Sequence, residues 1–466
     1  MHTCTIRGCV ACRSWPGLRR NALAAIFAAG LLSLTVTPSL AMPRAERVVS
    51  PGGIEAWLLE TRQVPLITIA FSFKGGALQE PSDKLGVAYL TTFLFNEGAG
   101  GMDTQALTRK RQRIAVQFSC GTYMMENKCT FSTPSAHGGE AFDLLRLAIA
   151  EPRFDAEPLE QARRQLLTEL EYETQDPGSL AWYALARQLY GQNRYSLPVK
   201  GTPDGARSVT RDDVAAYRSR TFARDNLRIS VAGDIDAATL GPLLDKVFGD
   251  LPAKSTAMAL PVVSTESAQP TRQSIAMDLP QATALFGNIV PKMEWRKAIA
   301  FSIANQILSG TFTGRLFKEV REKQGLVYTI ASAHGEFEKF GTFYGSFGAV
   351  SENAAKAMTF TIAELERLRS EGPTEDELRD AKQSYLGGIY LGMDTSDKLA
   401  SWFLTLQTQD LPITYLDDFI AEVEHLDVEA VKAAAREVIR PDRLAQVFVG
   451  PVKLDAQDAP QPASSP

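Results

Sequence analysis

Hydrophobic and polar positions in the first third of the chain alternate between the periods of strands and helices. The apolar runs at 54–60 and 66–74, bounded by glycine and proline turns, predict two antiparallel strands. Residues 86–95 have the pattern of a buried helix, and residues 157–174 that of a long charged helix. Strands interleaved with helices in this order favour an α+β fold.

The same arrangement occurs twice. The chain contains 466 residues, too many for one ordinary hydrophobic core. Two helix starts, at 208–214 and 425–431, lie 217 positions apart, and at this offset Leu227 and Leu444 both begin apolar strands. This repetition predicts a tandem duplication. The expected fold is therefore α+β with two homologous domains, each a mostly antiparallel sheet with helices packed on one face.

A change in composition marks the boundary between the two copies. Residues 252–273 are rich in Ser, Thr, Pro and small side chains and have little periodicity, as is typical of an interdomain linker. This predicts an N-terminal domain at 47–251 and a C-terminal domain at 274–450. The polar residues 455–466 are expected to form a disordered tail.

Residues 1–41 have the three parts of a secretory signal peptide. Four arginines precede an apolar run at 22–36, and Ser39-Leu40-Ala41 offers the small residues that a signal peptidase recognises. A membrane anchor is the alternative, but the apolar run is short. We expect cleavage after Ala41 and a periplasmic or secreted protein with no stable membrane anchor. Losing four arginines and no acids takes the net charge from −5 to −9, which leaves no basic footprint for nucleic acid.

Export would leave only two of the five cysteines, Cys120 and Cys129. If Met124 and Met125 form the tip of a two-residue hairpin, these cysteines face each other across its strands. A disulfide could then form in an oxidising compartment. Two buried free thiols are the alternative, and the sequence does not decide between them.

Residues 314–330 combine a short amphipathic helix, a glycine stop and a strand. Gly325 stands where a left-handed cap would end the helix, and an alternating strand pattern follows at 326–333. The corner between the two elements should bring Arg321 and Tyr328 close together. By themselves, an arginine favoured by the helix dipole and an ordinary strand tyrosine would explain the pattern.

The segment Arg-Leu-Phe-Lys-Glu-Val-Arg-Glu-Lys-Gln-Gly-Leu-Val-Tyr, ending at Tyr328, resembles the second-domain signature of the pitrilysin/insulinase family of zinc peptidases, the inverzincins. In that family an Arg and a Tyr seven positions apart reach into the active site. The resemblance implies that Arg321 and Tyr328 hydrogen-bond the scissile carbonyl and the oxyanion formed from it. A guanidinium and a phenol are suitable donors for developing negative charge.

The zinc motif of the family is degenerate in this chain. Active members carry H-x-x-E-H on a helix, with two His ligands and a Glu as general base. Tyr89, Thr92 and Phe93 stand at these positions, and none can replace the residue that the chemistry needs. The downstream Glu ligand has a match in Glu169, which we expect to be a solvated or hydrogen-bonded helix residue. The three histidines beyond residue 41 lack ligand spacing and are expected to be isolated surface or capping residues. We therefore expect this chain to bind no metal or other cofactor.

By resemblance, the chain looks like the non-zinc-binding subunit of bacterial two-subunit peptidases, in which a homologous partner holds the zinc. Its expected partners are that zinc-binding subunit and an extended peptide or unfolded protein substrate. Metalloendopeptidase activity is expected only in the heterodimer. The alternative is a catalytically inactive scaffold or peptide-binding protein of the same fold, which also has precedent in the family. A self-sufficient metallopeptidase would need ligands that the sequence lacks.

Overall fold

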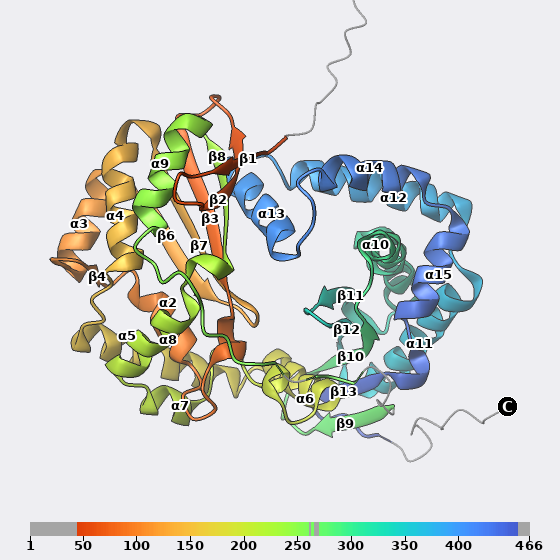
Figure 1. Ribbon diagram of the computed structural model, residues 1–466. Helices are drawn as coiled ribbons and strands as arrows, with labels where there is room; N and C mark the ends of the chain where they lie inside the picture. Colours follow the sequence, from red (N-terminus) through yellow and green to blue (C-terminus); the bar gives the residue numbers. More distant parts are fainter. Residues whose placement is uncertain (1–43, 261, 265–269, 455–466) are drawn as a thin grey trace, which may run out of the picture. The chain divides into compact units, whose positions relative to one another are not determined.

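The computed structural model describes residues 44–260, 262–264 and 270–454. The predicted signal peptide and C-terminal tail lie outside these ranges. The described chain contains two large sheets, one in each half of the sequence, and helices that cover them (Figure 1). Within the described residues, no helix is both long enough and apolar enough to cross a bilayer.

The first sheet has six strands in the order β1-β2-β8-β3-β7-β6. These are β1 (Glu46–Val49), β2 (Glu55–Glu60), β8 (Leu227–Gly233), β3 (Leu66–Lys74), β7 (Glu126–Pro134) and β6 (Gln117–Thr122). The two strands predicted near the N-terminus are present, but they are not paired with each other. Strand β8 lies between them, parallel to β2 and antiparallel to β3. Nearly every residue of β8 is buried, so this apolar strand is stable only in a central position.

Helices from the first half pack on one face of this sheet (Figure 1). They are α2 (Val87–Leu94), α3 (Thr104–Arg113), α4 (Gly138–Ala150), α5 (Ala156–Glu173), α7 (Pro203–Ser208), α8 (Arg211–Thr221) and α9 (Ala237–Phe248). Phenylalanine rings fill much of the core between the layers. Phe71 of β3, for example, meets Phe248 of α9 edge to face, with ring centroids 5.2 Å apart.

The second sheet has five strands in the order β11-β12-β10-β13-β9. These are β11 (Val327–Glu336), β12 (Phe340–Val350), β10 (Gln281–Pro291), β13 (Ala445–Val449) and β9 (Thr271–Ile275). Its helices are α10 (Trp295–Ser309), α11 (Ala354–Glu371), α12 (Glu375–Leu391), α14 (Tyr415–His425) and α15 (Val428–Val438). Strand β9 starts inside the predicted linker and pairs in parallel with β13. The exact domain limits stay a prediction.

The duplication is visible in matching elements. Helices α8 and α15 share their boundaries at the predicted offset of 217 residues, and each leads through a short 3₁₀ turn into a buried strand. Gly233 ends β8 and Gly450 directly follows β13. Both glycines have positive φ, 134° at Gly233 and 138° at Gly450. A Cβ atom on Gly233 would lie 2.0 Å from the carbonyl oxygen of Leu66, so this turn requires glycine. The prediction of two homologous α+β domains is confirmed.

Each half also contributes one helix to the other half's sheet. Helix α6 (Pro177–Tyr190) packs on β10 and β13, and its counterpart α13 (Ser396–Thr408) packs on β3 and β8. The buried Gln407 amide donates to the carbonyl oxygen of Ile229 at 2.7 Å. The sheet face that the first set of helices leaves open is therefore covered by a helix from the other half of the chain.

Helix α2, which carries the degenerate zinc motif, begins at a buried glutamate. Glu80 accepts hydrogen bonds from the backbone N–H groups of Gly86 (3.0 Å) and Ala88 (2.8 Å). Burial raises the pKa of Glu80 to about 8, although these backbone hydrogen bonds act in the opposite direction. Its second carboxyl oxygen is buried and has no hydrogen-bond partner. Glu80 is therefore expected to be largely protonated at neutral pH.

This environment predicts a pH-dependent stability. The pKa of Glu80 is higher in the folded chain than in the unfolded chain. The contribution of Glu80 to the free energy of unfolding is therefore complete below about pH 4.5 and is lost as the pH rises to about 8. The variant Glu80→Gln should flatten this dependence, because a neutral amide keeps one acceptor for the helix. Urea unfolding at pH 5.5 and 8.5 measures the effect, with the exposed Glu46→Gln as control. If the free energy of unfolding changes equally between the two pH values for wild type and Glu80→Gln, the prediction is contradicted.

Candidate functional site

The four positions of the zinc motif lie on two helices that face each other. Tyr89 of α2 donates its hydroxyl hydrogen to the carboxylate of Glu169 on α5, with both oxygens 3.0 Å away. Lys200 places its ammonium 3.0 Å from Glu169 and 3.0 Å from Glu173. Glu169 is thus a hydrogen-bonded helix residue, one of the two environments expected from the sequence.

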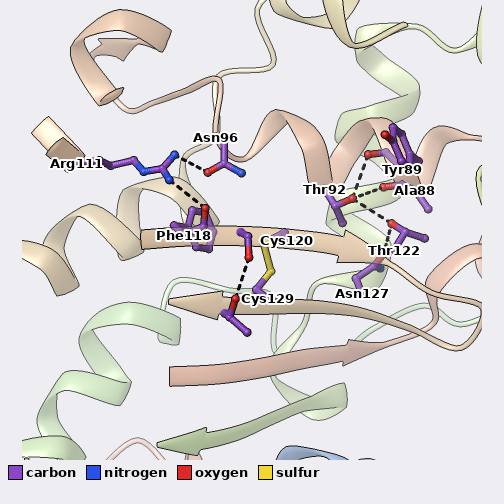
Figure 2. The surroundings of a disulfide bond; sticks show 12 residues. Ala88, Tyr89, Thr92, Asn96, Arg111, Phe118, Cys120, Thr122, Asn127 and Cys129 are labelled. Carbon is purple, nitrogen blue, oxygen red and sulfur yellow. Dashed lines mark hydrogen bonds between the residues drawn. A yellow bond between two sulfur atoms is a disulfide. The ribbon is translucent and has the colours of Figure 1, made fainter. Parts of the chain in front are cut away.

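The other two positions of the motif face protein atoms. Thr92 is 2% exposed, and its hydroxyl lies 3.1 Å from that of Thr122 on β6 (Figure 2). The same hydroxyl donates to backbone carbonyls one turn earlier in α2, as a threonine inside a helix commonly does. Phe93 packs its ring against the core of the first domain. Neither side chain offers a carboxylate or an imidazole.

Strand β6, which faces Thr92, is joined to β7 by a disulfide. The hairpin turns at Met124 and Met125, where the N–H of Tyr123 donates to the carbonyl of Glu126 at 2.8 Å. This register places Cys120 opposite Cys129, with Cα atoms 4.1 Å apart, and the structure joins their sulfur atoms (Figure 2). The bond ties the edge strand of the first sheet to its neighbour.

The helix that carries Arg321 is η6 (Phe317–Lys323), a π-helix and not the α-helix that the sequence predicted. Its wider turn accommodates an i→i−5 hydrogen bond from Gln324 to Glu319. Gly325 then adopts φ 63° and ends the helix, which confirms the predicted left-handed cap. The Arg321 guanidinium lies over the ring of Phe317, with its carbon 4.5 Å from the ring centroid.

Tyr328 lies at a second irregularity, in β11. Val327 pairs with Ala349 and Thr329 with the next residue, Gly348, so Tyr328 is the extra residue of a β-bulge. Its side chain is 50% exposed. Within the described residues, neither Arg321 nor Tyr328 makes a side-chain hydrogen bond or an ion pair. Both donors are therefore available to another molecule.

An ion pair between the buried Arg315 and the partly exposed Glu377 fixes the start of η6. The Arg315 guanidinium donates to both carboxylate oxygens of Glu377 on α12, at 2.8 and 2.7 Å, and to the carbonyl of Gly372 at 2.9 Å. Burial alone would raise the pKa of Glu377, but the hydrogen bonds from Arg315 and from Thr374 lower it to about 2. This forked contact anchors the segment that presents Arg321.

One of the three predicted surface or capping histidines is placed differently. His334 lies in β11 and packs its ring against Phe301, with centroids 5.6 Å apart. Burial lowers the pKa of His334 to about 4, so it is neutral at physiological pH. Within residues 44–260, 262–264 and 270–454, no three His, Cys, Asp or Glu side chains form a group that could hold a metal ion.

The arrangement matches known proteins over most of the chain. A model of the insulinase family, peptidase family M16, matches residues 57–203, and a model described as the peptidase M16 inactive domain matches residues 208–385. The chain belongs to the insulinase (M16) family. The predicted resemblance is thereby confirmed.

Relatives of this M16 chain carry different descriptions. It is 24% identical to the uncharacterized zinc protease YmxG of Bacillus subtilis, over 85% of this chain and 96% of that one. It is 22% identical to the non-peptidase homolog YmxG of Helicobacter pylori, over 80% of this chain and 86% of that one. Family membership therefore does not decide whether an M16 chain is a peptidase.

Two solved structures show the same fold. A structure of a peptidase M16 inactive domain from Pseudomonas fluorescens aligns with a TM-score of 0.83 and 25% identity, covering 88% of this chain and 99% of that one. The periplasmic protease PqqL from Escherichia coli aligns with a TM-score of 0.76 and 14% identity. In that case 88% of this chain covers only 45% of the longer PqqL chain.

The side chains of this M16 chain do not fit the family's zinc ion. Phe93 has no donor atom, and the phenol of Tyr89 uses its hydrogen on Glu169. Glu169 in turn is engaged by the ammonium of Lys200. No hydrolytic step can be derived for these residues.

Three features of the M16 site could not be recognised in the sequence. They are the ammonium of Lys200 beside Glu169, the ring of Phe317 under Arg321, and the forked pair of Arg315 with Glu377. Only the last left a signal, since Thr374 and Glu377 have the spacing of a helix capping box. What this chain retains chemically is a pair of exposed donors, suited to stabilising negative charge on a bound group.

Proposed function

We propose that this chain is the non-zinc-binding subunit of a heterodimeric periplasmic zinc metallopeptidase. A homologous partner with an intact H-x-x-E-H motif would hold the zinc. Arg321 and Tyr328 would act at that metal, as donors to the scissile carbonyl and to the oxyanion that forms from it. The observation that carries this proposal is the contrast between the two halves of the family site. The zinc positions are filled by other contacts, whereas both donors are exposed and unpaired.

Two further observations support the proposal. Tyr328 lies near the start of β11, which is the edge strand of the second sheet in the described chain. Farther along β11, the N–H and the carbonyl of Ser332 are hydrogen-bonded to Ser309 and Asn305 of α10. An extended peptide could add to such an edge as another strand, beside the two donors. In addition, the chain corresponds to about half of the PqqL chain, so a second homologous chain would supply the other half. The periplasmic location rests on the predicted signal peptide.

The competing function is a catalytically inactive scaffold or peptide-binding protein. The description of the Helicobacter pylori relative as a non-peptidase homolog favours it. A scaffold of this kind would still bind a partner or a peptide, but its binding would not require unpaired Arg321 and Tyr328 side chains. A neighbouring open reading frame with an intact H-x-x-E-H motif would favour the peptidase subunit.

Cleavage of an unstructured protein such as casein tests the two functions. Three preparations are compared with zinc present: this chain, the H-x-x-E-H homologue, and their mixture. We expect cleavage by the mixture only. Equal rates for the homologue alone and for the mixture would contradict the proposal and favour the scaffold.

A further inference from the structure

Polar side chains from three segments meet at the degenerate zinc motif. Tyr89 comes from α2, Glu169 and Glu173 from α5, and Lys200 from the turn before α7. The Lys200 ammonium lies 3.0 Å from each carboxylate, and the Tyr89 hydroxyl lies 3.0 Å from Glu169. The side chains are partly buried, with 36% of Lys200, 31% of Glu169 and 16% of Glu173 exposed.

The backbone next to Lys200 holds it against α2. Gly201 has φ 88°, and a Cβ atom there would lie 2.3 Å from the backbone nitrogen of Gly86, just before the helix. Only glycine allows the turn to approach so closely. Lys200 therefore reaches α5 from a turn that is pressed against the start of α2.

The electrostatics of the cluster require a cation. Glu169 and Glu173 are four residues apart on one helix, a spacing at which like charges repel. Gln165 donates to Glu169 at 3.1 Å, and Tyr183 donates to Glu173, but neither donor carries charge. Among the contacts of the described residues, Lys200 supplies the positive charge that both carboxylates share.

We propose that Lys200 is a built-in substitute for the metal ion: its ammonium occupies a cation site formed by Glu169, Glu173 and Tyr89, and it holds α2 against α5 without a metal. The chain would thus keep the positive charge of its family's zinc site while losing the chemistry. This inference does not rest on the proposed function, because it concerns the first domain alone.

The titration of these groups agrees with the assignment. Burial works to lower the pKa of Lys200, but its hydrogen bonds to the two glutamates outweigh burial and raise it. Burial works to raise the pKa of Glu169, but hydrogen bonds from Lys200, Gln165 and Tyr89 outweigh it, so the pKa is lowered. Both groups are therefore ionised at neutral pH.

The two tyrosines that face the cluster, Tyr89 and Tyr183, have raised pKa values and stay neutral between pH 4.5 and 8. Burial and the neighbouring Glu169 raise the pKa of Tyr89 to about 12, although Lys200 lowers it in part. Burial, Glu173 and Asp176 raise the pKa of Tyr183. A change in stability between pH 4.5 and 8 that depends on Lys200 would therefore not come from either tyrosine.

The test compares Lys200→Met with Lys246→Met, which removes an exposed ion pair with Asp143 in the same domain. At pH 8 the first substitution should lower the Tm by roughly 5 °C and the control by far less. At pH 4.5 the loss for Lys200→Met should shrink, because the Glu169 carboxylate, no longer paired with Lys200, can then take up a proton. A loss no larger than that of the control, or an equal loss at both pH values, would overturn the inference.

A second variant asks whether the two carboxylates need the cation. Adding Glu169→Gln and Glu173→Gln to Lys200→Met removes both negative charges, so it should restore much of the Tm that Lys200→Met loses at pH 8. If the triple variant is no more stable than Lys200→Met at pH 8, charge compensation does not hold the cluster together and the inference is wrong.

Discussion

Replacing Arg321 with alanine, or Tyr328 with phenylalanine, is expected to lower the turnover of the reconstituted heterodimer about a hundredfold. In the proposed function each substitution removes one donor to negative charge that develops in the transition state, and Tyr328→Phe removes only a hydroxyl group. The kcat should therefore fall more than the KM rises. Steady-state cleavage of a fluorogenic peptide by the mixed subunits measures both constants.

Matched controls separate this effect from damage to the fold. Lys323→Ala removes a neighbouring cation of η6, and Tyr172→Phe removes the hydroxyl of another exposed tyrosine. Both controls should leave kcat within about twofold of the wild type, because surface changes of this kind rarely alter stability or geometry. Arg321→Lys should stay impaired, since a compact ammonium lacks the planar fork of arginine. Unchanged rates for Arg321→Ala and Tyr328→Phe would show that neither side chain takes part in the reaction.

The largest loss of stability is expected for Arg315→Ala, about 3 kcal/mol in the free energy of unfolding. The substitution leaves the Glu377 carboxylate without its forked partner and the Gly372 carbonyl without a donor. It also releases the start of η6, so the mixed subunits should lose activity together with stability. Urea unfolding of the purified chain at pH 7 gives the free energy.

The control for Arg315→Ala is Arg379→Ala, which breaks an exposed pair with Asp376 on the same helix as Glu377. It should cost at most about 0.5 kcal/mol. The pKa of Glu377 is lowered on folding. The contribution of Glu377 to the free energy of unfolding is therefore present above about pH 4.5 and is lost as the pH falls toward 2. The difference between wild type and Arg315→Ala should narrow over that interval. A loss at pH 7 no greater than that of Arg379→Ala would contradict the assignment.

Most elements of the fold could be predicted from the chain because their signals are local. The glycine stop at Gly325, the hairpin tip at Met124 and Met125, and the repeat at an offset of 217 residues all depend on short stretches of sequence. The two strands predicted near the N-terminus do run antiparallel, but the position of β8 between them depends on contacts between residues far apart in the chain and was not expected. The packing of α6 and α13 on each other's sheets was not predicted for the same reason. The apolar face of a helix indicates that it is buried but does not identify the sheet that buries it.

Of the candidate site, only the residues that belong to a family motif could be predicted from the sequence. The motif pointed to Tyr89, Thr92, Phe93 and Glu169, and to the positions of Arg321 and Tyr328. It carried no information on backbone geometry, so the π-helix at Arg321 and the bulge at Tyr328 were not expected. Such irregularities change the direction of a side chain and commonly occur at functional sites.

The measurement that tests the central claim most directly is a titration of the H-x-x-E-H homologue, at fixed concentration, with this chain. We predict that peptide cleavage rises from near zero to a plateau at one chain per homologue. The double variant Arg321→Ala/Tyr328→Phe should give almost no cleavage, yet compete with the wild-type chain and suppress its activity, because it still occupies the partner. If the double variant supports the same plateau as the wild type, this chain does not supply the donors, and a scaffold role explains it better.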